Sequence, residues 1–212
     1  VASLLSKRIP VHLICDLQTE DGQCLTKTKT PHQHMANAIT PDGKVFPLSL
    51  MPMPRLYLIG AVHISQHLAP MAIAAGFAVT VIDPRQDFAN PERFPDIDLI
   101  TSWPDEVLNN SANPLDENTA LVTLTHDPKI DDAALVAALG EPVFHIAALG
   151  SRRTHSGRCE RLRQAGYDEA DINRIEGPAG LNIHAHTSAE IAVSILASVI
   201  KARRHRKTAE QS

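Results

Sequence analysis

Three short stretches of the sequence gather side chains that could bind an anion. The stretch GSRRTH at 150–155 joins a glycine and two hydroxyls to two adjacent guanidinium groups, directly before a predicted helix. The stretch THDP at 125–128 places an imidazole beside a carboxylate, and the third stretch runs from Gly60 to His63. Guanidinium groups and the free N–H groups of a helix N-terminus are donors that bind phosphates and other oxyanions well. The three stretches therefore indicate a binding site for a small anionic ligand.

Each stretch follows an apolar run of strand length, and from residue 55 onward such runs alternate with helical patterns. We predict strands at 55–60, 78–83, 97–101, 120–125 and 143–148, and helices at 63–76, 105–109, 131–140, 155–165 and from 188 onward. Runs rich in Val, Ile and Leu are typical of strands that are buried on both faces. This order predicts an α/β fold: a doubly wound, mostly parallel Rossmann-like sheet with helices on both faces. Because parallel strands end at one edge, we expect the three stretches to line one crevice.

The turn after the first predicted strand is similar to a dinucleotide-binding turn, but it lacks the second glycine. The three small positions of such a turn hold Gly60, Val62 and Ser65 here. Asp83 ends the next strand at the spacing from which an acid reaches a ribose hydroxyl, and Arg85 could meet a phosphate instead. A branched side chain at position 62 would enter the space of a pyrophosphate. Three interpretations stay open: an NAD(P) site, a site for a differently shaped anion, and a turn that only connects strand and helix.

Composition limits the classes of partner. The chain has 212 residues, of which 43% are hydrophobic, enough for one substantial core with a small attached lobe. A net charge of -4 provides no broad basic field, so we expect no nucleic-acid partner. No apolar run approaches the roughly 20 residues of a membrane helix, so we expect no membrane span.

Cysteine usage points to a reducing compartment. Cys15, Cys24 and Cys159 are odd in number and have no metal-ligand spacing, which argues against a disulfide framework and against a structural zinc site. The N-terminus shows no basic region followed by an apolar one, as a secretion signal would. We therefore expect a cytoplasmic protein.

The chain divides into three predicted parts. Residues 1–54 form a short N-terminal lobe and linker, residues 55–205 form the Rossmann-like domain, and residues 206–212 form a disordered tail. Within the first part, VHLICDL is a candidate strand and PLSLMPMPR a proline-punctuated linker, and we expect the segment to pack as a small lobe or as an edge hairpin on the main sheet. Thr187 or Ser188 is the expected N-cap of the final helix.

The predicted crevice contains histidines, arginines, hydroxyls and an acid, but the sequence has no nucleophile elbow and no HExxH motif. It also has no cysteine and histidine at the spacing of a known nucleophile pair. This inventory favours ligand binding over the breaking of covalent bonds. Whether the protein is an enzyme stays open.

Six stretches between residues 54 and 201 resemble the XdhC/CoxI family, the maturation factors of xanthine dehydrogenase, carbon monoxide dehydrogenase and related molybdenum hydroxylases. The stretches are PRLYLIGAVHISQHLA, VTVIDPR, FANPERFP, LVTLTHDPKIDDAAL, ALGSRRTHSGRCERLRQAG and GPAGLNIHAHTSAEIAVSILASVI. The resemblance implies a protein that binds molybdenum cofactor, a pterin carrying a phosphate, and assists its insertion or sulfuration in an apo-enzyme, with a sulfurtransferase as a further partner. It also implies that the cofactor crevice is lined by Gly60, His63, Asp83, Arg85, His126, Asp127, Ser151, Arg152 and Arg153.

The sequence departs from the family pattern at two places. Residues 1–54 contain no Gly-Ser-x-Pro-Arg motif, and GLNIHAHTSAEIA stands where the family usually reads GLDIGARTPEEIA. Asn182, His184 and His186 thus replace an acid, a glycine and an arginine. The two histidines alternate along a segment expected to be extended, so they would point the same way and could hold a metal if a third ligand joined them.

Two alternatives to the maturation role remain at this point. An NAD(P)-dependent oxidoreductase would use Asp83 to bind the ribose. A ligand-free interaction module for a dehydrogenase would fit the short N-terminal part and the altered GLNIHAHT segment. The apolar final helix must be covered, either by its own sheet or by a second copy in a homodimer.

Overall fold

The computed structural model describes residues 1–18, 24–27 and 39–209. The chain forms two compact units. The smaller unit contains Val1–Met53 and Arg204–Ser212, and the larger unit contains Pro54–Arg203. In the described part of the chain, no helix combines the length and the apolar character needed to cross a membrane.

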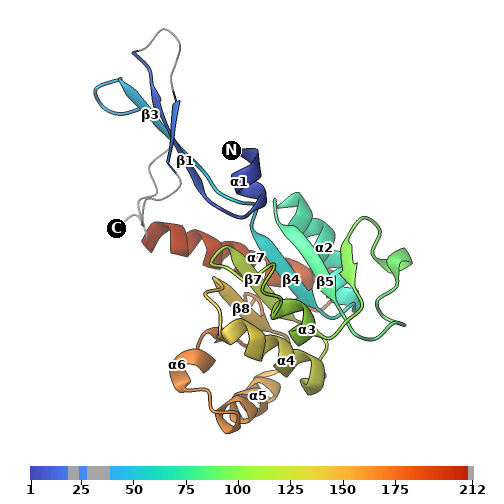
Figure 1. Ribbon diagram of the computed structural model, residues 1–212. Coiled ribbons are helices and arrows are strands. Elements are labelled where there is room, and N and C mark those ends of the chain that lie inside the picture. Colours follow the sequence, from blue (N-terminus) through green and yellow to red (C-terminus); the bar gives the residue numbers. More distant parts are fainter. Residues whose placement is uncertain (19–23, 28–38, 210–212) are drawn as a thin grey trace. The chain divides into compact units, whose positions relative to one another are not determined.

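The larger unit is built on a six-stranded parallel sheet, shown in Figure 1. Its strands are β4 (Arg55–Ile59), β5 (Ala78–Ile82), β6 (Asp98–Ile100), β7 (Thr119–Thr123), β8 (His145–Ala148) and β9 (Ile175–Glu176). They lie in the order β6-β5-β4-β7-β8-β9, so the winding direction reverses between β4 and β7. This reversal is the topological switch point of a doubly wound fold, next to which ligands usually bind. The predicted fold class is confirmed.

Helices cover both faces of this sheet. They are α2 (His63–Ala74), α3 (Pro104–Leu108), α4 (Pro128–Leu139), α5 (Arg152–Gln164), α6 (Glu169–Ile172) and α7 (Ser188–Ala209), together with the 3-10 helix η1 (Pro91–Arg93). Successive side chains of a strand point to opposite faces, so each inner strand contributes to two cores. Tyr57 and Ile59 of β4 belong to one core cluster, whereas Leu56 and Leu58 belong to the other.

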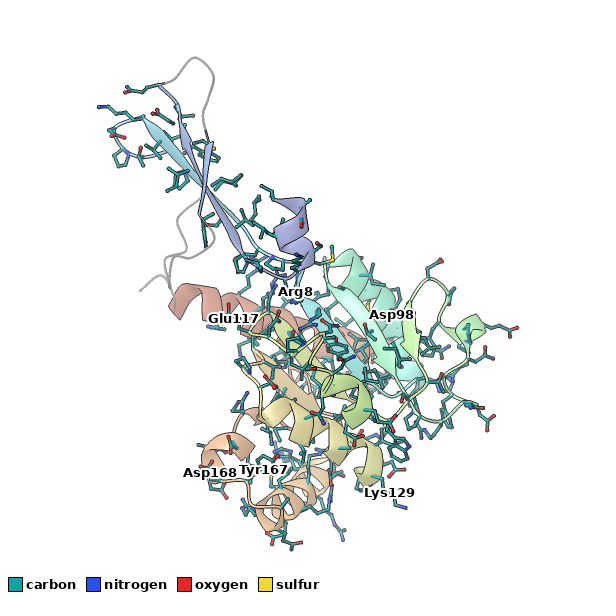
Figure 2. All side chains as sticks on the ribbon, viewed as in Figure 1. Arg8, Asp98, Glu117, Lys129, Tyr167 and Asp168 are labelled. Atoms are coloured by element: carbon teal, nitrogen blue, oxygen red, sulfur yellow. The ribbon has the colours of Figure 1, made fainter. Side chains whose placement is uncertain are left out.

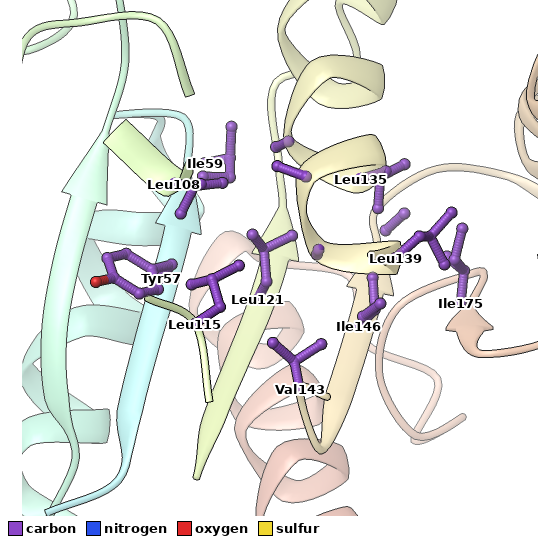
Figure 3. Packing of buried hydrophobic residues seen from close by; sticks show 14 of the residues in the cluster. Tyr57, Ile59, Leu108, Leu115, Leu121, Leu135, Leu139, Val143, Ile146 and Ile175 are labelled. Atoms are coloured by element: carbon purple, nitrogen blue, oxygen red, sulfur yellow. The ribbon is translucent and has the colours of Figure 1, made fainter. Parts of the chain in front are cut away.

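The two cores have different helical covers. Leu135 and Leu139 of α4 pack over the first face together with Leu121 of β7, as Figure 3 shows. Leu68 of α2 and Ile195 of α7 pack in the second cluster. The final helix is therefore covered at least in part by its own sheet, which is one of the two covers expected from the sequence.

Several predicted boundaries need correction. Helix α4 begins at Pro128 rather than 131, because the Asp127 carboxylate caps it and proline is favoured at the first helical position. Helix α5 begins at Arg152 rather than 155, because Ser151 is its N-cap. Strand β9 was not predicted. Helix α7 continues to Ala209, into the range expected to be a disordered tail.

The smaller unit has its own antiparallel sheet of β1 (Val11–Asp16), β2 (Cys24–Lys27) and β3 (Val45–Leu50), preceded by helix α1 (Ala2–Ser6). The expected strand at VHLICDL is confirmed. The expected linker is wrong in part, because β3 pairs through Pro47 opposite Ile14. The sheet order is β2-β1-β3, so this segment is not an edge hairpin of the main sheet.

One cysteine expectation is also wrong. Cys15 is disulfide-bonded, and the register of β1 and β2 places Cys24 opposite it. Cys159 on α5 is a buried free thiol. The cysteine count alone did not predict this, because it takes no account of cross-strand pairing.

Candidate functional site

The predicted site residues lie where the parallel strands of the larger unit end. Gly60 follows β4, Asp83 follows β5, His126 lies just beyond β7, and Gly150 lies just beyond β8. The pairs β4–β5, β4–β7 and β7–β8 are all parallel, so these loops leave the sheet at the same edge. We call this edge the rim.

The Gly60 turn and the THDP loop are in direct contact at the rim. Gly60 has a φ of 117°, a conformation that favours glycine. A Cβ atom on this residue would lie 2.7 Å from Cγ2 of Thr125, too close for two carbon atoms. The turn therefore needs glycine for its backbone shape and for the close approach of the neighbouring loop.

The Asp83 carboxylate is fully buried and holds two parts of the rim together. Oδ2 accepts a hydrogen bond of 2.8 Å from the N–H of Ala61 and one of 2.7 Å from Nη2 of Arg85. Oδ1 accepts bonds from Nε and the backbone N–H of Arg85. A ribose hydroxyl would have to displace one of these donors, so the arrangement does not favour the predicted ribose contact of Asp83.

Arg85 is partly exposed and stacks on an aromatic ring. Its side chain is 32% exposed, and its guanidinium carbon lies 4.1 Å from the ring centroid of Phe88. The pKa of Arg85 is raised, mainly by the hydrogen bonds to Asp83 and also by the charges of Asp127 and Asp131. Arg85 thus lies in the electric field of the THDP loop and brings a positive charge to the rim.

The carboxylate of Asp131 on α4 binds the THDP loop through hydrogen bonds. The Asp131 carboxylate is 1% exposed and accepts hydrogen bonds from the hydroxyl of Thr125, at 2.7 Å, and from the N–H of His126, at 3.1 Å. His126 has a φ of 63°, and its side chain is exposed. The Asp127 carboxylate accepts from the N–H of Lys129 and caps α4, whose start is marked by Lys129 in Figure 2.

A buried pair connects this loop with the loop that follows β8. Nη2 of Arg158, which is 2% exposed, lies 3.9 Å from Oδ2 of Asp131 and donates a 3.0 Å hydrogen bond to the carbonyl of Leu149. Burial raises the pKa of Asp131, although hydrogen bonds and Arg158 act in the opposite direction. Asp131 and Arg158 were not among the predicted site residues. The spacing of His155, Cys159 and Leu162 gives α5 an inward face, and this was the signal that could have found Arg158.

The predicted arginines are available to a ligand. Ser151 caps α5, because its hydroxyl accepts from the N–H of Thr154 at 3.1 Å. Arg152 and Arg153 occupy the first turn of α5, and both are exposed. Neither side chain has a hydrogen bond or ion pair within residues 1–18, 24–27 and 39–209. Their backbone N–H groups belong to the part of a helix that has no acceptor inside the helix.

The remaining histidines are more peripheral. His63 is exposed in the first turn of α2. His184 has a φ of 56°, so the segment with His186 is not extended as expected. Among the described residues, no group of three metal-ligating side chains includes this pair.

The rim thus joins two kinds of feature. Asp83, Arg85, the Gly60 turn and the THDP loop are linked to each other by the contacts above. Arg152 and Arg153 lie on the helix after the next strand, connected to the THDP loop through Arg158. This is a parallel α/β domain whose rim carries two ion pairs, Asp83 with Arg85 and Asp131 with Arg158, and two exposed arginines, Arg152 and Arg153.

Comparison with known proteins agrees with this class. The XdhC Rossmann domain matches residues 56–199, and the chain belongs to the XdhC family. The chain is 33% identical over 153 residues to the uncharacterized protein YqeB of Escherichia coli, covering 71% of this chain and 27% of that protein. It is 27% identical over 208 residues to the molybdenum cofactor insertion chaperone PaoD of the same organism, covering 98% of this chain and 56% of that protein.

Two further relatives carry xanthine dehydrogenase names. A Bacillus subtilis protein, named as a probable subunit of xanthine dehydrogenase, is 32% identical, with coverage of 72% of this chain and 44% of the relative. The crystal structure of a xanthine dehydrogenase from Bacillus halodurans superimposes with a TM-score of 0.74 at 24% identity, over 97% of this chain and 63% of that one, which shows a shared fold. The chain spans between 27% and 56% of the length of the curated relatives.

Proposed function

We propose that this protein binds molybdenum cofactor and assists its insertion into the apo-form of a molybdenum hydroxylase. One relative is named as a molybdenum cofactor insertion chaperone and another as a probable xanthine dehydrogenase subunit. The single structural observation that carries the proposal is the pair Arg152 and Arg153, exposed at the first turn of α5 on the rim of the sheet.

The rim residues fit a phosphorylated pterin. Two guanidinium groups and the first N–H groups of α5 offer several donors to a phosphate. Gly150 has a φ of 142°, and a Cβ atom there would lie 3.0 Å from the side chain of Thr154, so the backbone before the helix must be glycine. When bound, the cofactor supplies the redox centre that the acceptor enzyme lacks. This chain's residues would hold its phosphate and shield the ligand until transfer.

The same reasoning assigns roles to the other predicted residues. Arg85 adds positive charge at the switch point, and the exposed ring of His126 is a hydrogen-bonding group on the THDP loop. Gly60 and Asp83 shape the rim: the backbone of Gly60 allows the loops to approach, and the carboxylate of Asp83 holds Arg85 and Ala61 in place. His63 and Asp127 complete the polar edge.

The oxidoreductase alternative has weaker support. The turn lacks its second glycine, and the Asp83 carboxylate is already occupied by Arg85 and Ala61. A sulfurtransferase partner, a role in sulfuration, a homodimer and a cytoplasmic location stay predictions.

A transfer experiment tests the proposed function. Apo-xanthine dehydrogenase is mixed with molybdenum cofactor in the presence or absence of this chain, and the recovered dehydrogenase activity is measured over time. We expect faster recovery with the wild-type chain, and less with a chain carrying Arg152→Ala and Arg153→Ala. Recovery at the same rate with and without the wild-type chain would contradict the insertion role.

A further inference from the structure

A cavity of about 460 Å³ lies in the larger unit beside the first turn of α5. It is enclosed by the chain that follows β8, the segment 178–185 and the first half of α7. Its volume falls in the range of about 300–1,000 Å³ that small-molecule sites occupy. Of the predicted site residues, Arg152 lines this cavity, whereas the Gly60 turn and the THDP loop do not.

The lining combines one cation with apolar walls. Among the described residues that line the cavity, Arg152 alone carries a charge. Leu149, Leu181 and Ile191 provide apolar surface, and each is only partly exposed. Asn182 adds an exposed amide at the same cavity. A ligand that matches this lining has an apolar or aromatic body and a negatively charged group.

The wall formed by residues 178–181 is fixed in place before any ligand binds. The N–H of Ala179 donates to the carbonyl of Ala148 at 3.0 Å, and the N–H of Gly180 donates to Oε1 of Glu176 at 2.6 Å. The N–H of Leu181 donates to the carbonyl of Ser194, whose hydroxyl donates back to the carbonyl of Leu181 at 2.5 Å. A wall tied to β8, β9 and α7 loses little conformational entropy on binding.

Close packing explains how the cavity keeps its shape. A Cβ atom on Gly180 would lie 2.4 Å from Oγ of Ser194, so the wall rests directly against α7. The Ser194 hydroxyl is consequently engaged with the protein. This leaves Arg152, Asn182 and the N-terminus of α5 to contact the polar part of a ligand.

We propose that this cavity binds a heteroaromatic ring carrying a phosphate monoester. The ring lies between Leu149, Leu181 and Ile191, and the phosphate is bound by Arg152 and the first N–H groups of α5. This inference rests on the proposed function and deepens it, because it assigns the pterin ring to the cavity and the phosphate to its mouth. A nucleoside monophosphate shares the same chemistry and is the other source from which the ligand could come.

The test measures binding of a defined probe to the full chain. Titration of 6-hydroxymethylpterin monophosphate is followed by pterin fluorescence, with unphosphorylated 6-hydroxymethylpterin, inorganic phosphate and guanosine monophosphate as parallel ligands. We expect the phosphorylated pterin to bind at least about tenfold more tightly than either of its halves, since both the ring and the charge contribute. Tighter binding of guanosine monophosphate would assign a nucleotide as the natural ligand of the same site.

Three variants probe the cavity, and two matched variants serve as controls. Arg152→Glu reverses the charge, Ala185→Phe fills the space, and Asn182→Asp adds a negative charge at an exposed position. We expect each to weaken probe binding, the first two by about tenfold or more. Lys201→Glu and Ala189→Phe make the same kinds of change at exposed positions outside the cavity, and we expect them to stay within about twofold of wild type. Thermal unfolding shows whether each variant is folded.

The outcomes separate this inference from the proposed function. No binding of the probe by the wild-type chain, or unchanged binding in all three cavity variants, would overturn the cavity assignment even if the chain retains molybdenum cofactor. Binding that depends on Arg152 and Ala185 supports the assignment. It does so even if the chain accelerates no transfer to an apo-enzyme, a result that would count against the proposed function alone.

Discussion

The guanidinium of Arg85 lies 2.7 Å from the fully buried carboxylate of Asp83. Burial alone would raise the pKa of Asp83, but the hydrogen bonds from Arg85 and Ala61 outweigh burial and hold the pKa below its ordinary value. The pair occupies the place where a dinucleotide-binding domain normally presents a free acid to a ribose. In this chain, that acid has become part of the scaffold of the rim.

Replacing Arg85 by alanine should destabilise the protein by about 2 kcal/mol, because a buried carboxylate would lose its cation. This cost is smaller than is usual for breaking a buried pair because Arg85 is partly exposed. Urea unfolding of the two proteins at pH 7 measures the difference. The double variant with Asp83→Asn should be less destabilised than the sum of the single changes, and simple additivity would show that the two residues do not interact.

The same pair predicts a change in acid stability. A carboxyl group with a lowered pKa in the folded state contributes stability above its ordinary pKa of 3.8, and this contribution is lost as the pH falls through the lower folded value. Without Arg85, burial should raise the pKa of Asp83. The pH at which the protein loses stability in acid should therefore rise. We expect Arg85→Ala to lose stability at a higher pH than the wild type. Parallel curves of unfolding free energy against pH would contradict this.

Gly60→Ala should destabilise the protein by about 2 kcal/mol, because the new Cβ atom meets Thr125 and the backbone has a positive φ. Thr125→Ser removes the methyl group involved and keeps the hydroxyl that binds Asp131. The double variant should therefore recover part of the loss, with the backbone strain remaining. If adding Thr125→Ser to Gly60→Ala recovers no free energy of unfolding, the contact between the two loops is not the cause of the destabilisation.

His145 should make the protein less stable in mild acid. Burial lowers the pKa of this histidine, although the charge of Glu176, 3.9 Å away, acts in the opposite direction. A histidine with a lowered folded pKa takes up its proton more readily when unfolded, so its stability contribution is present above about pH 6.5 and is lost as the pH falls. His145→Phe should reduce the loss of stability between about pH 7 and pH 5. An unchanged slope in this variant would contradict the account.

Much of the fold could be predicted from the apolar runs. Strands β4 and β5 were expected within a residue of their observed ends because LYLIG and VTVID are short apolar runs, although Thr80 of β5 is only half-buried. Strand β9 escaped prediction because it has only two residues, Ile175 and Glu176, beside a glycine and a proline. The start of α5 was misplaced because GSRRT has no apolar period, and the Ser151 cap is visible only in the hydrogen bonds.

The candidate site could be predicted only at the level of loops. The shared rim follows from the parallel strands, and the exposure of Arg152 and Arg153 agrees with the function assigned to them. Two features depend on tertiary contacts that no local pattern contains. One is the buried pair of Asp131 and Arg158, and the other is the cavity wall at 178–181.

The most direct test of the central claim is the retention of molybdenum cofactor by the purified chain. The protein is incubated with the cofactor and desalted, and pterin fluorescence and bound molybdenum are measured. We expect near-stoichiometric retention by the wild type and a loss of about tenfold or more in affinity in the variant with Arg152→Ala and Arg153→Ala, which should remain folded. The absence of retained pterin in the wild type, together with micromolar binding of NADH, would contradict the claim and favour an oxidoreductase.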